Sequence, residues 1–366
     1  MSENPIDMRD GLAVSARELL ARAAAAELRA YKGLMVAVDD FFLPEEARLD
    51  EHSRAGLAAL LRGLVETVEG EIREHAVRLL TGRSETLLVA KLIEPGNSVL
   101  ARLWNSGLLR DGALMGELIA RVRQEMLGAA LPMSAPDDPE RPSLINRFVQ
   151  HPDRVVAASA MAVLIAESRR RGSPEVGQFQ TELPAELHHR LVWWTAAALR
   201  ERVVDASESL DRVLCDAAQR SLAAYDEGDR LEAAAMRFAA AIDAQPGELP
   251  AMLVESLGDR RIVLFIALLG HGMGVPYELA RDLVLDPAAD RLWLALRALD
   301  IGREGVAQVG YALSEADPRR DLEKFADTLD TIAAIAPAEA RAALAPLKLD
   351  PDYRAALIAL QRGGAK

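Results

Sequence analysis

The stretch Leu183–Val203, LPAELHHRLVWWTAAALRERV, has the periodicity of an amphipathic helix. At 100° per residue, four apolar side chains fall on one broad face, namely Leu187, Leu191, Trp194 and Ala198. We expect this face to be buried against a neighbouring helix. The same periodicity recurs along almost the whole chain, whereas the alternation typical of β-strands is scarce. The pattern therefore predicts an all-α fold.

The expected helices are short, and many are bounded by Gly, Pro or acidic residues of the kind that end or begin a helix. Short helices cannot bury an apolar face alone, so they need neighbours. We therefore expect stacked antiparallel helix pairs, a HEAT-like α-solenoid, in one array or in two parts. The expected helices cover residues 12–32, 45–64, 66–81, 85–93, 97–106, 111–130, 143–150, 153–171, 183–204, 206–225, 228–244, 248–257, 259–269, 276–284, 288–299, 302–315, 318–335, 337–346 and 351–362.

One proline-rich stretch interrupts this helical pattern. The segment Pro132–Pro142, PMSAPDDPERP, contains four prolines and cannot continue a helix. It predicts a linker at 132–142 between an N-terminal helical region at 1–131 and a C-terminal HEAT-like helical region at 143–366.

The composition excludes several classes of protein. A formal net charge of −13 gives a long-range field of the wrong sign for non-specific nucleic-acid binding. The single cysteine rules out an intrachain disulfide. The start of the chain lacks the pattern of a secretory signal. The longest apolar run, Ile262–Gly270, is too short to span a bilayer. We expect a cytoplasmic protein without membrane insertion.

A more specific pattern begins near Leu253. It contains LVESLGDRRIVLFIALLGHGMGVPYELARDLVLDP followed by LALRALDIGR. Together with Leu49–Leu80 and the LPAELHHRLVWWTAAALR segment, this pattern resembles an uncharacterised family of alphaproteobacterial proteins, a domain of unknown function with HEAT-like helical repeats. The resemblance covers most of the chain past residue 45. It implies an all-helical array and brings no assigned catalytic residue.

The two adjacent histidines are the first candidates for chemistry. On the wheel, His188 borders the buried face, whereas His189, Trp193 and Arg200 lie on the outward face. Neighbouring residues on a helix point in different directions, so His188 and His189 are not expected to share a metal ion. Glu186 and His189 have the spacing of a di-iron site, but a second such pair is missing. An outward tryptophan beside a histidine and an arginine is typical of a partner-binding surface, and packing against a neighbouring helix pair is the alternative.

Other short motifs give no recognisable active site. GHGMG at Gly270–Gly274 predicts a helix C-cap and turn rather than a phosphate-binding loop. Cys215 is expected to be a buried structural thiol. The acidic pair in MVAVDDFF at Met35–Phe42 is expected to separate two helices. No nucleophile elbow or zinc-binding helix motif occurs in the sequence.

Two charged motifs have simple structural explanations. The arginines of SRRRG at Ser168–Gly172 are explained by the partial negative charge at a helix C-terminus, with contact to an acidic peptide or a phosphate as the alternative. DEGDR at Asp226–Arg230 predicts an ordinary solvated turn.

These observations favour a non-catalytic, cytoplasmic protein-interaction scaffold or regulatory adaptor with an unidentified protein partner. We predict that Trp193, His189 and Arg200 bind this partner, and we expect no catalytic residue, metal site or cofactor. Two alternatives stay open. One is a signalling phosphotransfer or small-ligand sensory module that uses His189 and Arg200. The other is a nucleic-acid-binding helical-repeat protein, which requires a basic concave surface.

Overall fold

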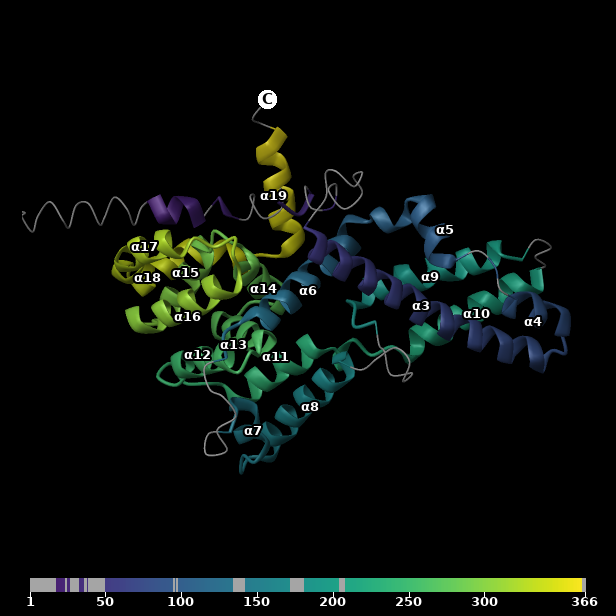
Figure 1. The fold of residues 1–366 in the computed structure, drawn as a ribbon, viewed down its shortest axis with the longest axis horizontal. Coiled ribbons are helices and arrows are strands. Elements are labelled where there is room, and N and C mark those ends of the chain that lie inside the picture. Colours follow the sequence, from purple (N-terminus) through teal and green to yellow (C-terminus); the bar gives the residue numbers. More distant parts are fainter. Residues whose placement is uncertain are drawn as a thin grey trace, which may run out of the picture. The chain divides into compact units, whose positions relative to one another are not determined.

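A computed structural model describes residues 18–23, 25–26, 33–35, 38, 50–94, 96, 98–133, 142–171, 181–203 and 208–363. These residues form α-helices, short 3₁₀ helices and turns, and no β-strand occurs among them (Figure 1). The prediction of an all-α fold is confirmed. Most of the helix expected at 12–32, and both Asp39 and Asp40 of the acidic pair, lie outside the described residues.

The chain divides into two compact units, each assembled from separate segments. Unit 1 contains Met1–Val36, Arg123–Val163 and Ala235–Lys366, and unit 2 contains Ala37–Val122 and Leu164–Ala234. The predicted linker at 132–142 stays a prediction, because residues 134–141 lie outside the described residues.

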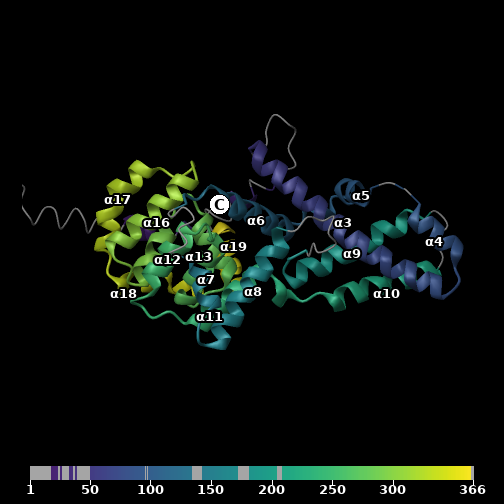
Figure 2. The same cartoon turned by 60° about the horizontal axis from the view of Figure 1, so that its bottom comes forward.

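Unit 2 is built around three helices that run alongside one another, α3, α9 and α10 (Figures 1 and 2). The apolar side chains of α3 recur at intervals of three and four from Leu57 to Leu80, and this stripe is buried. Asp50 caps its first turn by accepting a hydrogen bond from the Ser53 amide at 2.9 Å. The helices and 3₁₀ turns of this unit are α3 (Glu51–Gly82), α4 (Thr86–Ile93), α5 (Val99–Ser106), η2 (Leu108–Arg110), α9 (Ala185–Glu201), α10 (Glu208–Ala224) and η4 (Glu227–Asp229).

In unit 1, two helices are buried on almost every side. They are α13 (Ile262–Met273), which is apolar all round, and α15 (Asp290–Ala298). Helices adjacent in the sequence pack together, among them α12 with α13 and α16 with α17. The other elements of the unit are α7 (Leu144–Val149), α12 (Leu249–Gly258), α14 (Tyr277–Leu285), α16 (Arg303–Ala316), α17 (Leu322–Ala334), α18 (Pro337–Leu344), η5 (Ala345–Lys348) and α19 (Pro351–Gly363).

Three further helices contribute residues to both units: α6 (Gly112–Ala130), α8 (Arg154–Arg171) and α11 (Leu231–Ile242). No single described helix is both long and apolar enough to cross a membrane. Among pairs of described helices, α13 and α14 together reach that length and apolar character, but they are bent by 116° where they meet.

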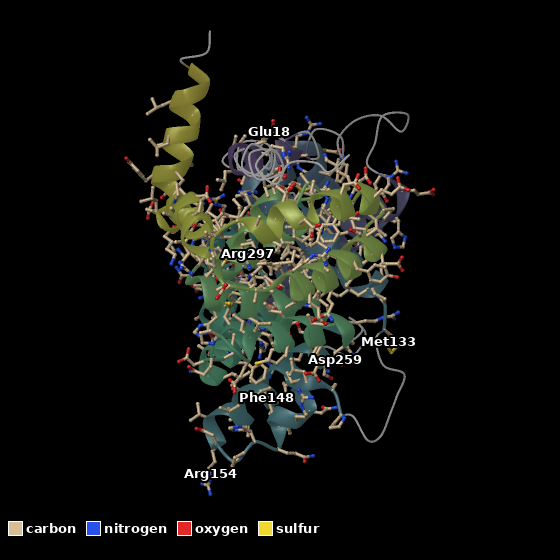
Figure 3. The ribbon with its side chains drawn as sticks, turned by 90° about the vertical axis from the view of Figure 1, so that its left-hand side faces the viewer. Glu18, Met133, Phe148, Arg154, Asp259 and Arg297 are labelled. Atoms are coloured by element: carbon tan, nitrogen blue, oxygen red, sulfur yellow. The ribbon has the colours of Figure 1, made fainter. Side chains whose placement is uncertain are left out.

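The buried polar groups of unit 1 hold helix ends together. Arg297, labelled in Figure 3, donates hydrogen bonds to the carbonyl oxygens of Ile301 and Ile335 at distances of 2.6 to 3.1 Å. These carbonyls lie just beyond α15 and α17, where no following helical amide can reach them. The GHGMG motif does hold a helix C-cap, because Gly274 follows α13 in the left-handed conformation with φ of 65°, but Gly270–Met273 continue the helix instead of forming the predicted turn.

The packing of α16 on α17 gives a first prediction. A Cβ atom on Gly310 would lie 2.0 Å from Cζ of Phe325, so Gly310→Ala should lower the free energy of unfolding by about 1–3 kcal/mol despite the better helix propensity of alanine. Gly70 in α3 is the matched control, since nothing lies within 4 Å of its added Cβ. Gly70→Ala should raise the free energy of unfolding by about 0.5–1 kcal/mol. Urea denaturation measures both changes, and the same sign for the two variants would refute the close contact.

Candidate functional site

The helix α9 separates the two histidines of the LHHRL sequence. Pro184 precedes its first turn, and Leu187, Leu191 and Ala198 are buried as the wheel predicts. Trp194 is only half-buried, so the prediction that it lies in the core is wrong. The reason lies in how α9 packs on α3 and α10. These helices cover the side of α9 that carries Leu191 and Val192, and they leave the neighbouring side, which carries Trp194, less covered.

His188 lies inside unit 2 with 2% of its surface exposed. Its Nδ1 atom is 2.9 Å from the Thr181 hydroxyl, and its ring stacks on Tyr225 with 3.9 Å between ring centres. The Nε2 atom is buried and has no hydrogen-bond partner among the described residues. Burial, together with the neighbouring His189, lowers the pKa of His188 to about 4. The imidazole is therefore neutral near pH 7.

Next to His188, the segment Thr181–Pro184 crosses the interior without forming a helix or strand. Thr181, Glu182 and Leu183 are all buried, so their polar backbone groups need partners. Arg121 donates a hydrogen bond to the Thr181 carbonyl at 3.1 Å, and the Tyr225 hydroxyl donates to the Leu183 carbonyl. Glu182 has a φ of 48°, a left-handed conformation that costs a non-glycine residue about 1–2 kcal/mol.

The side chain of Glu182 is held by a buried cluster of charges. Arg170 Nε donates to its Oε2 atom at 2.5 Å, and Arg121 Nη2 lies 3.4 Å from the same oxygen. Arg170 also donates through Nη2 to both oxygens of Glu232 at 2.8 Å. Arg230 approaches Glu232 at 3.8 Å. We call Arg121, Arg170, Glu182, Glu232 and Arg230 the buried ionic cluster.

The pKa shifts of Glu232 and Arg170 favour the charged forms of these two side chains in spite of their burial. Burial alone would raise the pKa of Glu232, but Arg170, Arg230 and Arg121 lower it to about 2. Burial opposes the charged form of Arg170 as well, yet Glu232 and Glu182 raise its pKa above the ordinary value. Burial raises the pKa of Tyr225 to about 12, so its hydroxyl stays protonated and can donate. This arrangement of hydrogen bonds and ion pairs can hold a non-helical segment in place.

On the outward side of α9, His189 and Trp193 contact each other. The indole Nε1–H of the half-buried Trp193 donates to His189 Nε2 at 3.1 Å. Because Nε2 accepts, the proton of the neutral imidazole is on Nδ1, and the lone pair of Nε2 is engaged. Arg200 is not part of this contact. It lies eleven positions beyond His189 in the sequence, about 16 Å along the helix axis, and pairs with Asp211 at 2.9 Å.

Three sequence-based expectations are corrected by the structure. Cys215 is exposed rather than buried, because α10 buries Val213, Leu214, Ala217 and Ala218 and turns the thiol away. Arg230 is buried in the ionic cluster, so DEGDR is not wholly a solvated turn. Arg170 does more than complement a helix C-terminus, since it bridges two buried glutamates.

The described residues offer no other assembled chemistry. No group of three or more His, Cys, Asp or Glu side chains in this part of the chain could hold a metal ion. A pocket of about 430 Å³ in unit 1 is lined by Val254, Gly305, Glu255 and Asp259, among others. Three carboxylates line it, and each has a partner within the chain. Glu304 accepts a hydrogen bond from Gln308 Nε2 at 3.5 Å. Glu255 accepts two hydrogen bonds from Arg147 at 2.6 Å, and Asp259, labelled in Figure 3, accepts from the Leu144 amide at 2.6 Å where α7 begins.

The fold and these sites define an all-α protein with a buried ionic cluster and a contact between Trp193 and His189 on the outward side of α9. Over residues 138–345 the chain matches the model of the family described as "Uncharacterised protein conserved in bacteria (DUF2336)". This match spans more than half of the chain, and the chain belongs to this family. No curated protein and no solved structure matches the chain. Arg121 and α19 lie outside the matched residues.

The buried ionic cluster gives a second prediction. Replacing Arg170 with methionine leaves Glu182 and Glu232 buried without their closest cation, so we expect the free energy of unfolding to fall by about 3–5 kcal/mol. Arg212→Ala is the control in the same unit, because it removes an exposed ion pair with Glu208 and should cost less than about 1 kcal/mol. Urea denaturation followed by circular dichroism measures both, and similar losses for the two variants would show that the cluster is not tightly coupled.

The buried imidazole gives a third prediction. The folded-state pKa of His188 is about 4 and the ordinary value is 6.5, so the unfolded chain binds the proton first. Its contribution to stability is complete above pH 6.5 and is lost as the pH falls toward 4. We expect the free energy of unfolding to fall by about 1–2 kcal/mol between pH 7 and pH 5 from this residue.

The comparison variant is His188→Phe, which keeps a ring against Tyr225 and cannot take up a proton. Urea denaturation at each pH should give it a shallower dependence than the wild-type protein. Parallel curves for the two proteins would exclude His188 as the source of the pH dependence.

Proposed function

We propose that this protein is a non-catalytic interaction scaffold that binds a protein partner through the outward face of α9. The observation that carries the proposal is the hydrogen bond from Trp193 to His189. This bond satisfies the one polar group of the indole within the chain itself. The part of the Trp193 ring that solvent reaches is therefore an apolar surface, and the hydrogen bond restricts the orientation of the ring.

A restricted aromatic side chain suits a binding hot spot. Tryptophan is enriched at such positions because a rigid ring buries a large area and loses little conformational freedom on binding. Protein-binding surfaces usually have an apolar centre enclosed by a polar rim. The charged residues around Trp193 on α9 could form such a rim. Arg190 pairs with Asp111 at 3.1 Å, and Arg200 pairs with Asp211.

The hydrogen bond between Trp193 and His189 also argues against the phosphotransfer alternative. A histidine that accepts a phosphoryl group attacks through a nitrogen lone pair, and in His189 the Nε2 lone pair accepts the Trp193 hydrogen bond. Arg200, the other residue of that alternative, pairs with Asp211 and lies about 16 Å away along the axis. The scaffold is therefore the better supported function. In it, the helices would stack as a HEAT-like array in the cytoplasm of a bacterium, with a variable surface on a fixed core.

The fourth prediction tests the Trp193 surface. We expect Trp193→Ala to lose a partner that wild-type protein captures, after cross-linking, from cells of the source bacterium, because truncation of a hot-spot residue typically costs 2 kcal/mol or more, roughly a thirtyfold loss of affinity. His189→Ala should weaken capture less, since it removes only the group that restricts the indole. Mass spectrometry of the cross-linked material measures both effects.

The matched control is Tyr311→Ala, which removes an exposed aromatic side chain from α16 in unit 1. It should capture the partner as the wild-type protein does. Thermal melts separate binding from folding. A large loss of melting temperature in Trp193→Ala would identify Trp193 as a packing residue, and unchanged capture by a well-folded variant would remove it from the interface.

A further inference from the structure

The pocket in unit 1 has an apolar wall built on packed helices. Helix α12 packs on α16 and on α7, and the pocket is lined by residues of α12, of the start of α16 and of the segment just before α7. Its volume of about 430 Å³ lies in the usual range for sites that hold small ligands. The apolar wall consists of Pro142, Pro250, Ala251 and Val254. This wall suits a ligand with an aliphatic portion.

The polar part of the same wall is acidic. Glu255, Asp259 and Glu304 line the pocket, and no basic side chain is among the described residues that line it. Arg147 pairs with Glu255, and its positive charge also interacts with Asp259. Three carboxylates set against this one guanidinium leave an excess of two negative charges. The pocket therefore attracts a cation.

The contact of Arg147 shows which kind of cation these carboxylates can hold. Its Nη1 and Nη2 atoms each donate a hydrogen bond to one oxygen of Glu255, both at 2.6 Å. This is the parallel, two-point geometry in which a planar guanidinium matches a carboxylate. A guanidinium is also hydrated more weakly than an ammonium group, so it loses less hydration beside an apolar wall.

The other two carboxylates have oxygen atoms left for a second guanidinium. Asp259 accepts the Leu144 amide through Oδ2, and among the described residues no donor reaches its Oδ1 atom. Glu304 is exposed, and the hydrogen bond that it accepts from Gln308 is long at 3.5 Å. An ionised carboxylate has about four acceptor positions. Both side chains can therefore accept further hydrogen bonds.

We propose that this pocket binds a guanidinium group carried on a short aliphatic chain. Asp259 and Glu304 accept hydrogen bonds from the guanidinium, and the wall at Pro250, Ala251 and Val254 contacts the aliphatic chain. All of these residues belong to unit 1, whereas Trp193 belongs to unit 2, so this inference does not rest on the proposed function.

The fifth prediction is selective binding of a guanidinium. Butylguanidinium is the probe, and butylurea is the control ligand because it has nearly the same shape without the charge. In an NMR titration of the isotope-labelled full chain at constant ionic strength, the probe should shift the amide signals of Val254, Gly258 and Gly305. We expect a Kd on the order of 1–10 mM, as for other ligands of this size. Butylurea should bind about tenfold more weakly, because it lacks the charge-assisted hydrogen bonds.

Two variants remove the charges of the acceptors one at a time. Glu304→Gln changes an exposed residue, and Asp259→Asn keeps an oxygen for the Leu144 amide. Each should weaken binding of butylguanidinium roughly three- to tenfold. Glu315→Gln is the matched control, since Glu315 is an exposed carboxylate of the same helix that does not line the pocket. It should bind the probe as the wild-type protein does.

A second probe distinguishes the two sources of a guanidinium group. The blocked tripeptide acetyl-Ala-Arg-Ala-amide presents the group as it occurs in a protein. Tighter binding of the tripeptide than of butylguanidinium assigns the site to an arginine of a protein partner. Weaker binding assigns it to a free guanidino compound, and both results support the guanidinium site.

Three results would overturn the proposal. The first is a titration in which the signals of the pocket residues do not move. The second is equal binding of butylurea and butylguanidinium. The third is an equal loss of binding in Glu304→Gln and Glu315→Gln, which would show only a general attraction of cations to a chain with a net charge of −13.

Discussion

Burial of the Thr181 and Leu183 carbonyl groups is the constraint on which the arrangement of unit 2 depends. These groups lie in the interior but belong to no helix, so the backbone cannot satisfy them by itself. Donors must come from side chains that reach inward, and Arg121 and Tyr225 provide them. A buried arginine in turn needs carboxylates, which explains why Glu182 lies where it does. The position of His188, between Thr181 and Tyr225, follows from the same requirement.

This constraint also orients α9. With its first turn held against Thr181 by His188, the helix can present His189 only on the other side, where it meets Trp193 one turn later. The inward histidine is thus a buried group that burial keeps in its neutral form, and the outward one is a hydrogen-bond acceptor for the half-buried Trp193 ring. Two adjacent residues of one type acquire different chemistry because they face environments of different polarity.

Periodicity predicts most of the described helices and most of the faces of α9, because those depend on residues three and four positions apart, but it wrongly placed Trp194 in the core. It placed His188 toward the core, and it placed His189 and Arg200 outward. It divided 45–64 from 66–81, although α3 continues through this point without a break. Nothing between Leu64 and Glu66 interrupts hydrogen bonding along the backbone, so the apolar stripe continues through Val65 and Val68.

The buried ionic cluster could not be predicted in the same way, because its partners are far apart in the sequence. Arg121 and Thr181 are separated by 60 residues, and Arg170 and Glu232 by 62. One local signal was present. Glu117 and Arg121 alternate with Leu114, Leu118 and Val122 within one helix, so they share its buried side instead of the solvated one. A charged residue in such a register must find an opposite charge inside the protein, since burying it alone is far too costly. The position of Arg121 on the buried side of its helix therefore predicts an internal ion pair. That its partner is Glu182, in the left-handed conformation, follows only from the tertiary fold.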